Sequence, residues 1–359
     1  MLKMAAGNPS LRSRFQGCLV SAVAGDCLGA PYEVKGVPAN TFQELVQFFQ
    51  QIGTDITEKD YLCYTDDTAM ARSVAQSLID NRGKLNGSDL AKKFAAEYIQ
   101  SPNRGYGADV ISILKPLGED LDDVYQPART QFGGSGSYGN GGAMRVAPVG
   151  LCPADNFDQM IEAARQSAQL THANAKGYNG AILQCLAVHL ALHSDPSSFD
   201  ANTFVDRLLE VMEKEEVVAV PPEAKVSRKG DGTPEQDEAK VYCQKLRLMK
   251  TLLKENADIK RIAAELGNEI LAHKSVPAAV YSFLRCQKPV RGIDLSCALE
   301  RTVMYAIALD GDTDTIGSMA GAIAGAFYGI ESVPSGWLTV CEGADHAMAQ
   351  ASQLHDIFF

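Results

Sequence analysis

The chain has 359 residues, of which 46% are hydrophobic, 21% charged and 7% aromatic. This composition is typical of a globular protein and excludes disorder over the whole chain. The 33 lysines and arginines against 44 aspartates and glutamates give a formal net charge of −11, which argues against direct DNA binding and against binding to an anionic membrane. A ligand that carries phosphate would therefore be held by local backbone amides or bound cations.

The nine cysteines are an odd number, scattered along the chain without a C-x-x-C spacing. Such usage is typical of reduced, packed thiols rather than of a disulfide framework. No run approaches the roughly 20 apolar residues of a membrane span. We therefore expect a protein of the nucleus and cytoplasm. Lys3, Arg12 and Arg14 precede the first acidic residue, which is weakly similar to an organelle transit peptide, so the mitochondrial matrix is a second expectation.

Apolar residues recur at helical spacing, and no alternating strand pattern or βαβ unit stands out. This predicts an all-α protein with helices over residues 15–28, 68–78, 90–99, 157–170, 180–192, 204–212, 246–253, 259–271 and 302–308. Residues 213–240 are charged and rich in proline, which predicts a long surface loop. Because a similar helical pattern resumes beyond it, we expect one domain over residues 1–359, with 1–13 disordered or serving in targeting.

Two of the predicted helices open on a pair of aspartates: residues 65–68 read Thr-Asp-Asp-Thr, and residues 312–315 read Asp-Thr-Asp-Thr. Threonine and aspartate are favoured at helix starts, where they accept hydrogen bonds from free amides. A cap needs one oxygen, however, and each cluster concentrates two carboxylates and two hydroxyls, which creates repulsion. These hard oxygen donors, placed face to face, predict a site for two Mg²⁺ ions, with Mn²⁺ as the substitute.

The helix after the second cluster is rich in alanine and glycine over residues 319–326. Glycine in a helix interior costs about 1 kcal/mol relative to alanine, so its presence indicates tight packing near the centre of the fold. Near the amino end, a Gly/Pro break at residues 29–31 is predicted to end the first helix and to place Glu33 in a loop. Taken alone, Glu33 is an ordinary surface glutamate.

Residues 133–142 form a loop with six glycines. Glycine permits positive φ and leaves backbone amides accessible to an anion, so a diphosphate is a suitable ligand. The loop matches neither the P-loop nor the dinucleotide-binding pattern. Phe132 and Tyr138 flank it or lie in it and are placed to stack on a base, although buried packing is the usual role of such residues. His172 lies in a turn between two predicted helices, where a structural hydrogen bond is the alternative to ligand contact.

The two clusters and the segment Gly-Ser-Tyr-Gly-Asn-Gly-Gly-Ala-Met-Arg at residues 136–145, in this order, resemble the signatures of the ADP-ribosylhydrolases. The resemblance runs from about Arg14 to the carboxyl end, and it is strongest to members that act on ADP-ribosyl-serine. It implies a compact orthogonal bundle of many helices and a binuclear magnesium centre. It also implies an O-glycosyl hydrolase that releases ADP-ribose.

The resemblance implies a role for each matching position. The implied metal ligands are Glu33, Thr65, Asp66, Asp67, Asp312, Asp314 and Thr315, with Glu33 on a mobile flap. The implied substrate contacts are Asp66, Phe132, Ser135, Gly136, Ser137, Tyr138, Gly139, Asn140, Gly141, His172 and Ile270. Among these, residues 135–141 would hold the diphosphate, and Phe132, Tyr138 and Ile270 the adenosine. Catalysis is expected from Glu33 as acid and base, and from Asp66, Asp67 or Asp312 as the group that orients water.

The expected substrates are proteins with serine-linked ADP-ribose, poly(ADP-ribose) and O-acetyl-ADP-ribose, and the expected state is a monomer. Three alternatives remain open: a hydrolase of ADP-ribosyl-arginine, a catalytically silent ADP-ribose-binding module, and a two-metal phosphatase that cuts the diphosphate. The presence of two complete oxygen clusters argues against the silent module, because recognition alone does not require so many paired charges.

Overall fold

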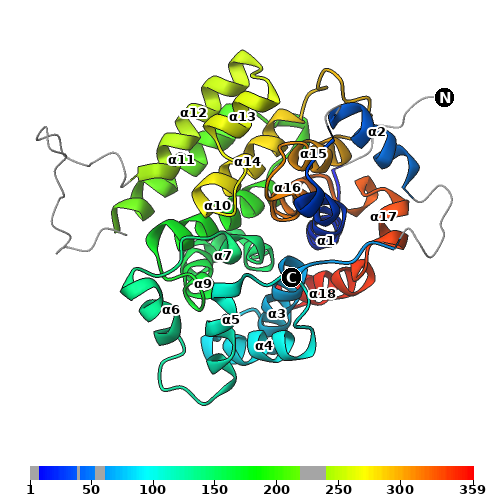
Figure 1. Ribbon diagram of the computed structural model, residues 1–359. Helices are drawn as coiled ribbons and strands as arrows, with labels where there is room; N and C mark the ends of the chain where they lie inside the picture. The colour runs from blue at the N-terminus through cyan, green and yellow to red at the C-terminus, as the bar shows by residue number, and fades with distance from the viewer. Residues whose placement is uncertain (1–7, 39–40, 53–60, 219–239) are drawn as a thin grey trace, which may run out of the picture.

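The computed structural model describes residues 8–38, 41–52, 61–218 and 240–359, and within these ranges the chain forms α-helices and no strand (Figure 1). The all-α prediction is confirmed. The helices are α1 (Leu11–Lys35), α2 (Thr41–Gln51), α3 (Asp66–Asp80), α4 (Gly87–Gln100), α5 (Ala108–Leu114), α6 (Gln126–Thr130), α7 (Gly141–Met144), α8 (Ala147–Gly150), α9 (Phe157–Gln169), α10 (Ala175–Leu192), α11 (Ala201–Val218), α12 (Val241–Glu255), α13 (Ile259–Glu265), α14 (Ala272–Arg285), α15 (Ala298–Ile307), α16 (Thr313–Tyr328), α17 (Ser335–Val340) and α18 (Ala344–Phe358).

Helices α1 and α16 lie side by side in the middle of the bundle and pack along most of their length (Figure 1). The pairing runs antiparallel: Gly17 faces Gly325, Gly25 faces Gly317, and Gly321 faces the carbonyl of Ser21. A Cβ added at Gly317 would lie 2.7 Å from the carbonyl oxygen of Gly25, closer than side chains pack in cores. Glycine at these positions therefore sets the distance between the two backbones, as the small residues over 319–326 predict.

This packing brings the end of α1 to the start of α16. A Cβ at Gly29 would lie 2.5 Å from the Cα of Asp314, and the hydroxyl of Thr313 donates to the carbonyl of Gly29 over 2.9 Å. Glu33 lies one helical turn beyond Gly29, so its side chain comes beside the second acidic cluster. The central helix pair thus positions a residue of the predicted site.

The first helix differs from its prediction at both ends. It begins at Leu11, so residues 11–13 are helical, while residues 1–7 lie outside the described part of the chain. It also continues through Pro31 to Lys35, although proline removes one helical hydrogen bond. The last turn is held by packing, because Tyr32 meets Phe48 of α2 edge to face at 5.9 Å. Glu33 is therefore in a helix and not in a loop.

Two further boundaries differ from the predictions. Helix α11 extends to Val218, so residues 213–218 of the predicted loop are helical, and residues 219–239 lie outside the described residues. Helix α13 ends at Glu265 rather than at 271, because Gly267 takes a φ of +105°, which ends a helix. The sequence predictions missed the short helices α5, α6, α7 and α8, and also α2, α14, α17 and α18. For α14 the reason is its burial on nearly all sides and an internal Pro277, which hide a helical period.

All nine cysteines are free thiols, and most are buried, as their spacing predicts. None of the helices in the described ranges combines the length and the apolar character required to cross a membrane.

Replacing Gly321 with alanine tests the close contact of α1 and α16. The new Cβ would lie 2.2 Å from the carbonyl oxygen of Ser21, a backbone atom. We therefore expect a cost in the upper part of the usual range for overpacking, about 2–3 kcal/mol, against the ~1 kcal/mol that alanine gains in helix propensity. We expect the free energy of unfolding to fall by about 1–2 kcal/mol in urea denaturation. Gly107→Ala is the control, because a Cβ there meets open space at a φ of −56°. Equal stability of the two variants would contradict the packing account.

Candidate active site

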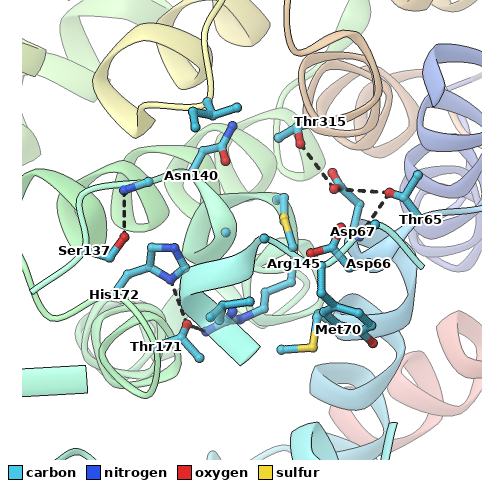
Figure 2. A pocket seen from close by; sticks show the side chains of 18 of the residues that line it. Thr65, Asp66, Asp67, Met70, Ser137, Asn140, Arg145, Thr171, His172 and Thr315 are labelled. Carbon is cyan, nitrogen blue, oxygen red and sulfur yellow. Dashed lines mark hydrogen bonds between the residues drawn. The ribbon is translucent and has the colours of Figure 1, made fainter. Parts of the chain in front are cut away.

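A cavity of about 340 Å³ gathers residues from all three motifs (Figure 2). Its walls come from the start of α3, the start of α16, the glycine-rich loop with α7, and the turn between α9 and α10. The end of α1, residues 105–110, Gln131 and Ile270 complete the lining. Segments far apart in the sequence therefore converge on one site.

The first acidic cluster is tied to α1 by Asp26, a fully buried aspartate within that helix. Its carboxylate accepts hydrogen bonds from the amide of Thr65 (3.0 and 3.1 Å) and from the hydroxyl of Thr65 (2.9 Å). It also accepts from the amide (3.0 Å) and the hydroxyl (2.6 Å) of Thr68. These donors compensate for the burial of the charge. Asp26 thus holds the start of α3 in place, a role that sequence reasoning missed.

The second cluster opens α16. The carboxylate of Asp312 accepts a short hydrogen bond from the side-chain amide of Asn140, and the carboxylate of Asp314 accepts from the amide of Thr315 over 2.8 Å. The hydroxyl of Thr315 donates to Oδ2 of Asp67 over 3.2 Å (Figure 2). This bond joins the two helix starts directly. The two clusters therefore face one another across the cavity, as the sequence predicts.

Burial and mutual repulsion disfavour the charged forms of these carboxyl groups. Burial first, then the charge of Asp314, raises the pKa of Asp26 to about 7, and burial followed by the charge of Asp26 raises the pKa of Asp66 to about 8. The pKa values of Asp67 and Asp312 are also raised well above the ordinary value, first by burial and then by Asp314. The fold therefore assembles acids that repel one another.

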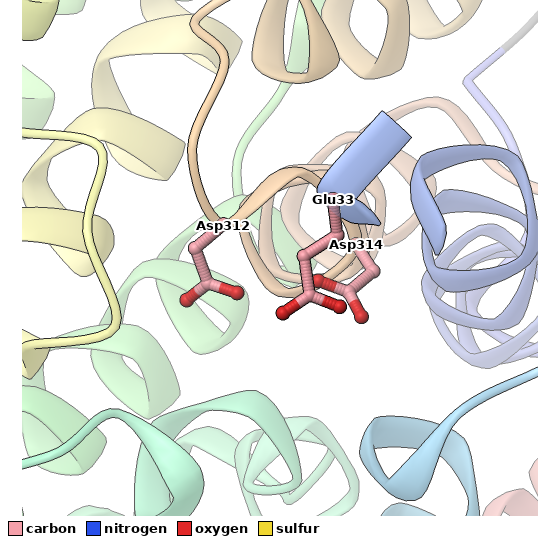
Figure 3. A group of neighbouring side chains, drawn as sticks. All are labelled: Glu33, Asp312 and Asp314. Atoms are coloured by element: carbon pink, nitrogen blue, oxygen red, sulfur yellow. The ribbon is translucent and has the colours of Figure 1, made fainter. Parts of the chain in front are cut away.

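A divalent cation fits this donor set. Oδ1 of Asp67 is buried and has no hydrogen-bond partner within the described residues, a costly state for a carboxylate oxygen. Glu33, Asp312 and Asp314 each place a carboxylate oxygen within 4.8 Å of the other two (Figure 3). All donors in both clusters are oxygens, which suits Mg²⁺, Mn²⁺ or Ca²⁺ better than Zn²⁺.

Glu33 lies in the last turn of α1, with an exposed side chain at the edge of the cavity. Partial burial, followed by repulsion from Asp314 and a hydrogen bond to it, raises the pKa of Glu33 to about 7. Glu33 therefore lies beside Asp312 and Asp314, where its role as a metal ligand stays a prediction. Its predicted location in a loop is wrong, because it lies in α1.

The glycine-rich loop is held against two other segments. The amide of Asn140 donates to the carbonyl of Ile270 (2.9 Å), and the amide of Ala272 donates to the carbonyl of Tyr138 (3.1 Å), which makes an isolated antiparallel bridge. Gly136, at a φ of +67°, leaves no room for a Cβ beside Ala173 and Asn174. Glycine is therefore required at position 136 for two reasons: the close approach of the α9–α10 turn and the positive φ.

The predicted substrate contacts divide between the cavity and its surroundings. Ser137, Gly139, Asn140, Gly141, His172 and Ile270 line the cavity. Phe132 and Tyr138 lie outside its lining with 52% and 45% of their surface exposed, and Ile270 is 64% exposed. The hydroxyl of Ser135 turns back to the carbonyl of Phe132 over 3.0 Å. The bridge joins Gly139 to Leu271, the residues that follow Tyr138 and Ile270, so two of the residues assigned to adenosine lie on adjoining segments.

One wall of the cavity has no sequence prediction. Residues 105–110 follow Arg104, whose guanidinium donates to both oxygens of Glu342 (2.6 and 2.8 Å) and lies 3.8 Å above the ring of Tyr64. Arg104 therefore fixes this wall beside the start of α3. Arg145 and Thr171 also line the cavity and were not singled out, although Arg145 closes the glycine-rich motif and a basic residue there was a usable signal.

Replacing Asp314 with asparagine tests the repulsion in the metal-free protein. Asparagine keeps an oxygen to accept from the amide of Thr315, but it removes one charge from the cluster, so with chelator present we expect the free energy of unfolding to rise by about 1 kcal/mol. Asp345→Asn is the control, since Asp345 makes the same 2.8 Å bond to the next amide in the exposed first turn of α18. The free energy of unfolding of Asp345→Asn should fall by about 0.3–1 kcal/mol, because the helix start loses a favourable negative charge. Destabilisation of both variants would contradict the account.

Comparison with known proteins agrees with this geometry. The family model for ADP-ribosylglycohydrolase matches residues 7–358. ADP-ribosylhydrolase ARH3 of Bos taurus is 45% identical over 361 residues, covering 98% of this chain and 95% of the relative. ADP-ribosylhydrolase ARH3 of Homo sapiens is 45% identical over 359 residues, covering 96% of this chain and 94% of the relative.

A solved structure described as an ADP-ribosylglycohydrolase-related protein complex shares the fold, with a TM-score of 0.62 at 20% identity over 97% of this chain and 99% of that chain. That likeness concerns the fold alone. The family model and the two relatives decide the family. The chain belongs to the ADP-ribosylglycohydrolase family and is a glycosyl hydrolase of ADP-ribosylated substrates.

Proposed function

We propose that this protein is a magnesium-dependent hydrolase that cleaves the O-glycosidic bond between ADP-ribose and serine in modified proteins. Poly(ADP-ribose) and O-acetyl-ADP-ribose, in which the leaving groups are a second ribose and acetate, are further substrates in this proposal. The observation that carries it is the direct junction of the two oxygen clusters, Thr315 to Asp67, at the base of the cavity. The 45% identity to proteins named ADP-ribosylhydrolase ARH3 supports it.

Two Mg²⁺ ions, or Mn²⁺ in their place, would be held by the oxygens of Glu33, Thr65, Asp66, Asp67, Asp312, Asp314 and Thr315. The hydroxyl of Thr315 donates to Asp67, which leaves its lone pairs available to a cation. When bound, the ions would supply a positive field that orients and polarises the hydroxyls of the distal ribose. Asp26 contributes by holding Thr65 and Thr68, so the ligands at the start of α3 keep their positions.

The cavity encloses one end of the proposed ligand. Its volume of about 340 Å³ is at the lower limit for a small-molecule site, ~300–1,000 Å³, so it suits the distal ribose and diphosphate rather than the whole of ADP-ribose. The diphosphate would lie against residues 135–141. The adenosine would then rest on Phe132, Tyr138 and Ile270, whose exposed side chains lie next to the cavity. This division explains why those apolar side chains are exposed.

The proposed reaction breaks the bond between the anomeric carbon and the serine oxygen, with oxocarbenium character in the transition state. A water molecule must be oriented toward the anomeric carbon, and a proton must reach the departing oxygen. We assign the orientation of the water to a carboxylate among Asp66, Asp67 and Asp312, which line the cavity. We assign the proton to Glu33, since its side chain is exposed at the edge, where a protein-bound serine arrives.

A hydrolase of ADP-ribosyl-arginine is the second candidate. The observation that favours it is Asp109, an exposed acid in the lining of the cavity, which would attract a guanidinium leaving group. The serine-linked substrate is preferred because of the identity to the relatives, which extends over nearly the whole chain.

A product assay tests the proposed function. Incubation of a serine-linked ADP-ribosyl peptide with the full chain and Mg²⁺ should release free ADP-ribose, and chelator should abolish the release because the carboxylates then lack their cations. Mass spectrometry identifies the product. Release of AMP would instead identify a phosphatase, turnover of arginine-linked peptide alone would favour the second candidate, and binding without turnover would indicate a silent module.

The role of Glu33 is tested by Glu33→Gln at saturating Mg²⁺. Glutamine keeps the size of the side chain but cannot exchange a proton, so kcat should fall by about 100-fold or more. The Kd for ADP-ribose, measured by calorimetry, should change by less than about threefold, because binding does not require the proton. Glu44→Gln, at an exposed position in the first turn of α2, is the control. Unchanged kcat in Glu33→Gln would remove Glu33 from the mechanism.

A further inference from the structure

His172 lies in the turn between α9 and α10 and lines the cavity, with 8% of its surface exposed (Figure 2). Its two ring nitrogens have different surroundings. Nδ1 lies 2.7 Å from the hydroxyl oxygen of Thr171. Nε2 faces the glycine-rich loop, since a Cβ at Gly139 would lie 3.3 Å from it and a Cβ at Gly141 would lie 3.0 Å from it. Within the described residues Nε2 has no hydrogen-bond partner.

Arg145 contacts the same hydroxyl from the other side. Arg145 is 1% exposed, and its guanidinium carbon lies 4.5 Å from the centre of the Phe94 ring. The guanidinium donates through Nη2 to the carbonyl of Ser167 (2.8 Å) and to Oγ1 of Thr171 (2.7 Å). A guanidinium has donors and no acceptor. The bond between Arg145 and Thr171 therefore has one possible direction, and Oγ1 of Thr171 is its acceptor.

The direction of this bond determines which nitrogen of His172 carries the proton. Thr171 is fully buried, and in the described part of the chain its Oγ1 bonds to Arg145 and His172 alone. If Nδ1 carried a proton, it would donate to Oγ1, and the hydroxyl proton would be buried without an acceptor, which is costly. If the hydroxyl donates to Nδ1, both the hydroxyl of Thr171 and Nδ1 of His172 are satisfied. The ring proton then lies on Nε2.

The doubly protonated ring is disfavoured by the same surroundings. Burial, and to a smaller extent the neighbouring charge of Arg145, lowers the pKa of His172 to about 3. The ring is therefore neutral at physiological pH.

We propose that Arg145 and Thr171 are positioning residues that hold His172 as the neutral tautomer with its proton on Nε2, so that the ring donates a hydrogen bond to an oxygen of the ligand beside the glycine-rich loop. The identification of that ligand as ADP-ribose rests on the proposed function. His172 then acts as a fixed donor and not as a base. The acceptor is a phosphoryl or ribose oxygen, because Nε2 faces Gly139 and Gly141.

The tautomer is measured by ¹⁵N NMR of the full chain labelled at histidine, with the His172 signals assigned from a His172→Gln variant. At pH 7 the wild-type spectrum should show Nε2 protonated and Nδ1 unprotonated. Thr171→Val removes the hydroxyl at nearly constant shape, so the tautomer with the proton on Nδ1 should appear. The Kd for ADP-ribose should rise about tenfold, the effect of losing one hydrogen bond to a charged group. Thr171→Ser should retain the wild-type tautomer and affinity.

Thr302→Val is the matched control. Thr302 is a fully buried threonine of α15 whose hydroxyl donates to the carbonyl of Ala298 over 2.8 Å, away from the cavity. It should change neither the spectrum of His172 nor the affinity. If Thr171 had a merely structural role, Thr171→Val would behave like Thr302→Val: its free energy of unfolding would fall, but the tautomer of His172 would not change.

A wild-type spectrum with the proton on Nδ1, or with both nitrogens protonated, would overturn the inference, as would a Thr171→Val variant that keeps tautomer and affinity unchanged. If Thr171→Val does not fold, the spectra of the wild type and of Thr171→Ser still test the inference, because both should show Nε2 protonated and Nδ1 unprotonated. Failure of this inference can be distinguished from failure of the proposed function. The tautomer is measured on the free protein, whereas failure of the proposed function appears as a lack of turnover or of ADP-ribose binding.

Discussion

Asp66, Asp67, Asp312 and Asp314 hold their carboxylates in one cavity, where burial leaves little water to screen the repulsion between them. The rest of the fold brings these groups together against that repulsion. Glycines let α1 and α16 touch backbone to backbone, which carries the end of α1 to the start of α16. Asp26 ties the start of α3 to the same helix. Much of the apolar packing in the centre therefore holds a polar site that would otherwise separate.

The opposite side of the cavity is built on a different principle. There the glycine-rich loop, the α9–α10 turn and the segment before α14 are joined by main-chain hydrogen bonds. Among the residues of these segments that line the cavity, Arg145 is the charged one, and it is basic. The cavity thus has an acidic end suited to cations and an end suited to phosphate oxygens, a polarity that agrees with the proposed position of the diphosphate.

Short-range patterns predicted the parts of the site that are local in the chain. The two helix starts, the glycine-rich loop and His172 all lie where their motifs indicate, and the clusters do face each other. Long-range packing decided the rest. Asp26 sits in an apolar helix and gives no motif, Glu33 stays helical because Tyr32 packs on Phe48, and Ile270 reaches the loop because α13 ends early at Gly267. Contacts of this kind are not encoded in a window of a few residues.

The central claim is that the two acidic helix starts act together as one binuclear cation site. Isothermal titration of the metal-free full chain with Mg²⁺ tests it most directly. The account predicts uptake of two ions per chain, with both sites weakened in Asp67→Asn, because Asp67 joins the clusters through Thr315. Absence of Mg²⁺ uptake, or uptake that Asp67→Asn leaves unchanged, would contradict it.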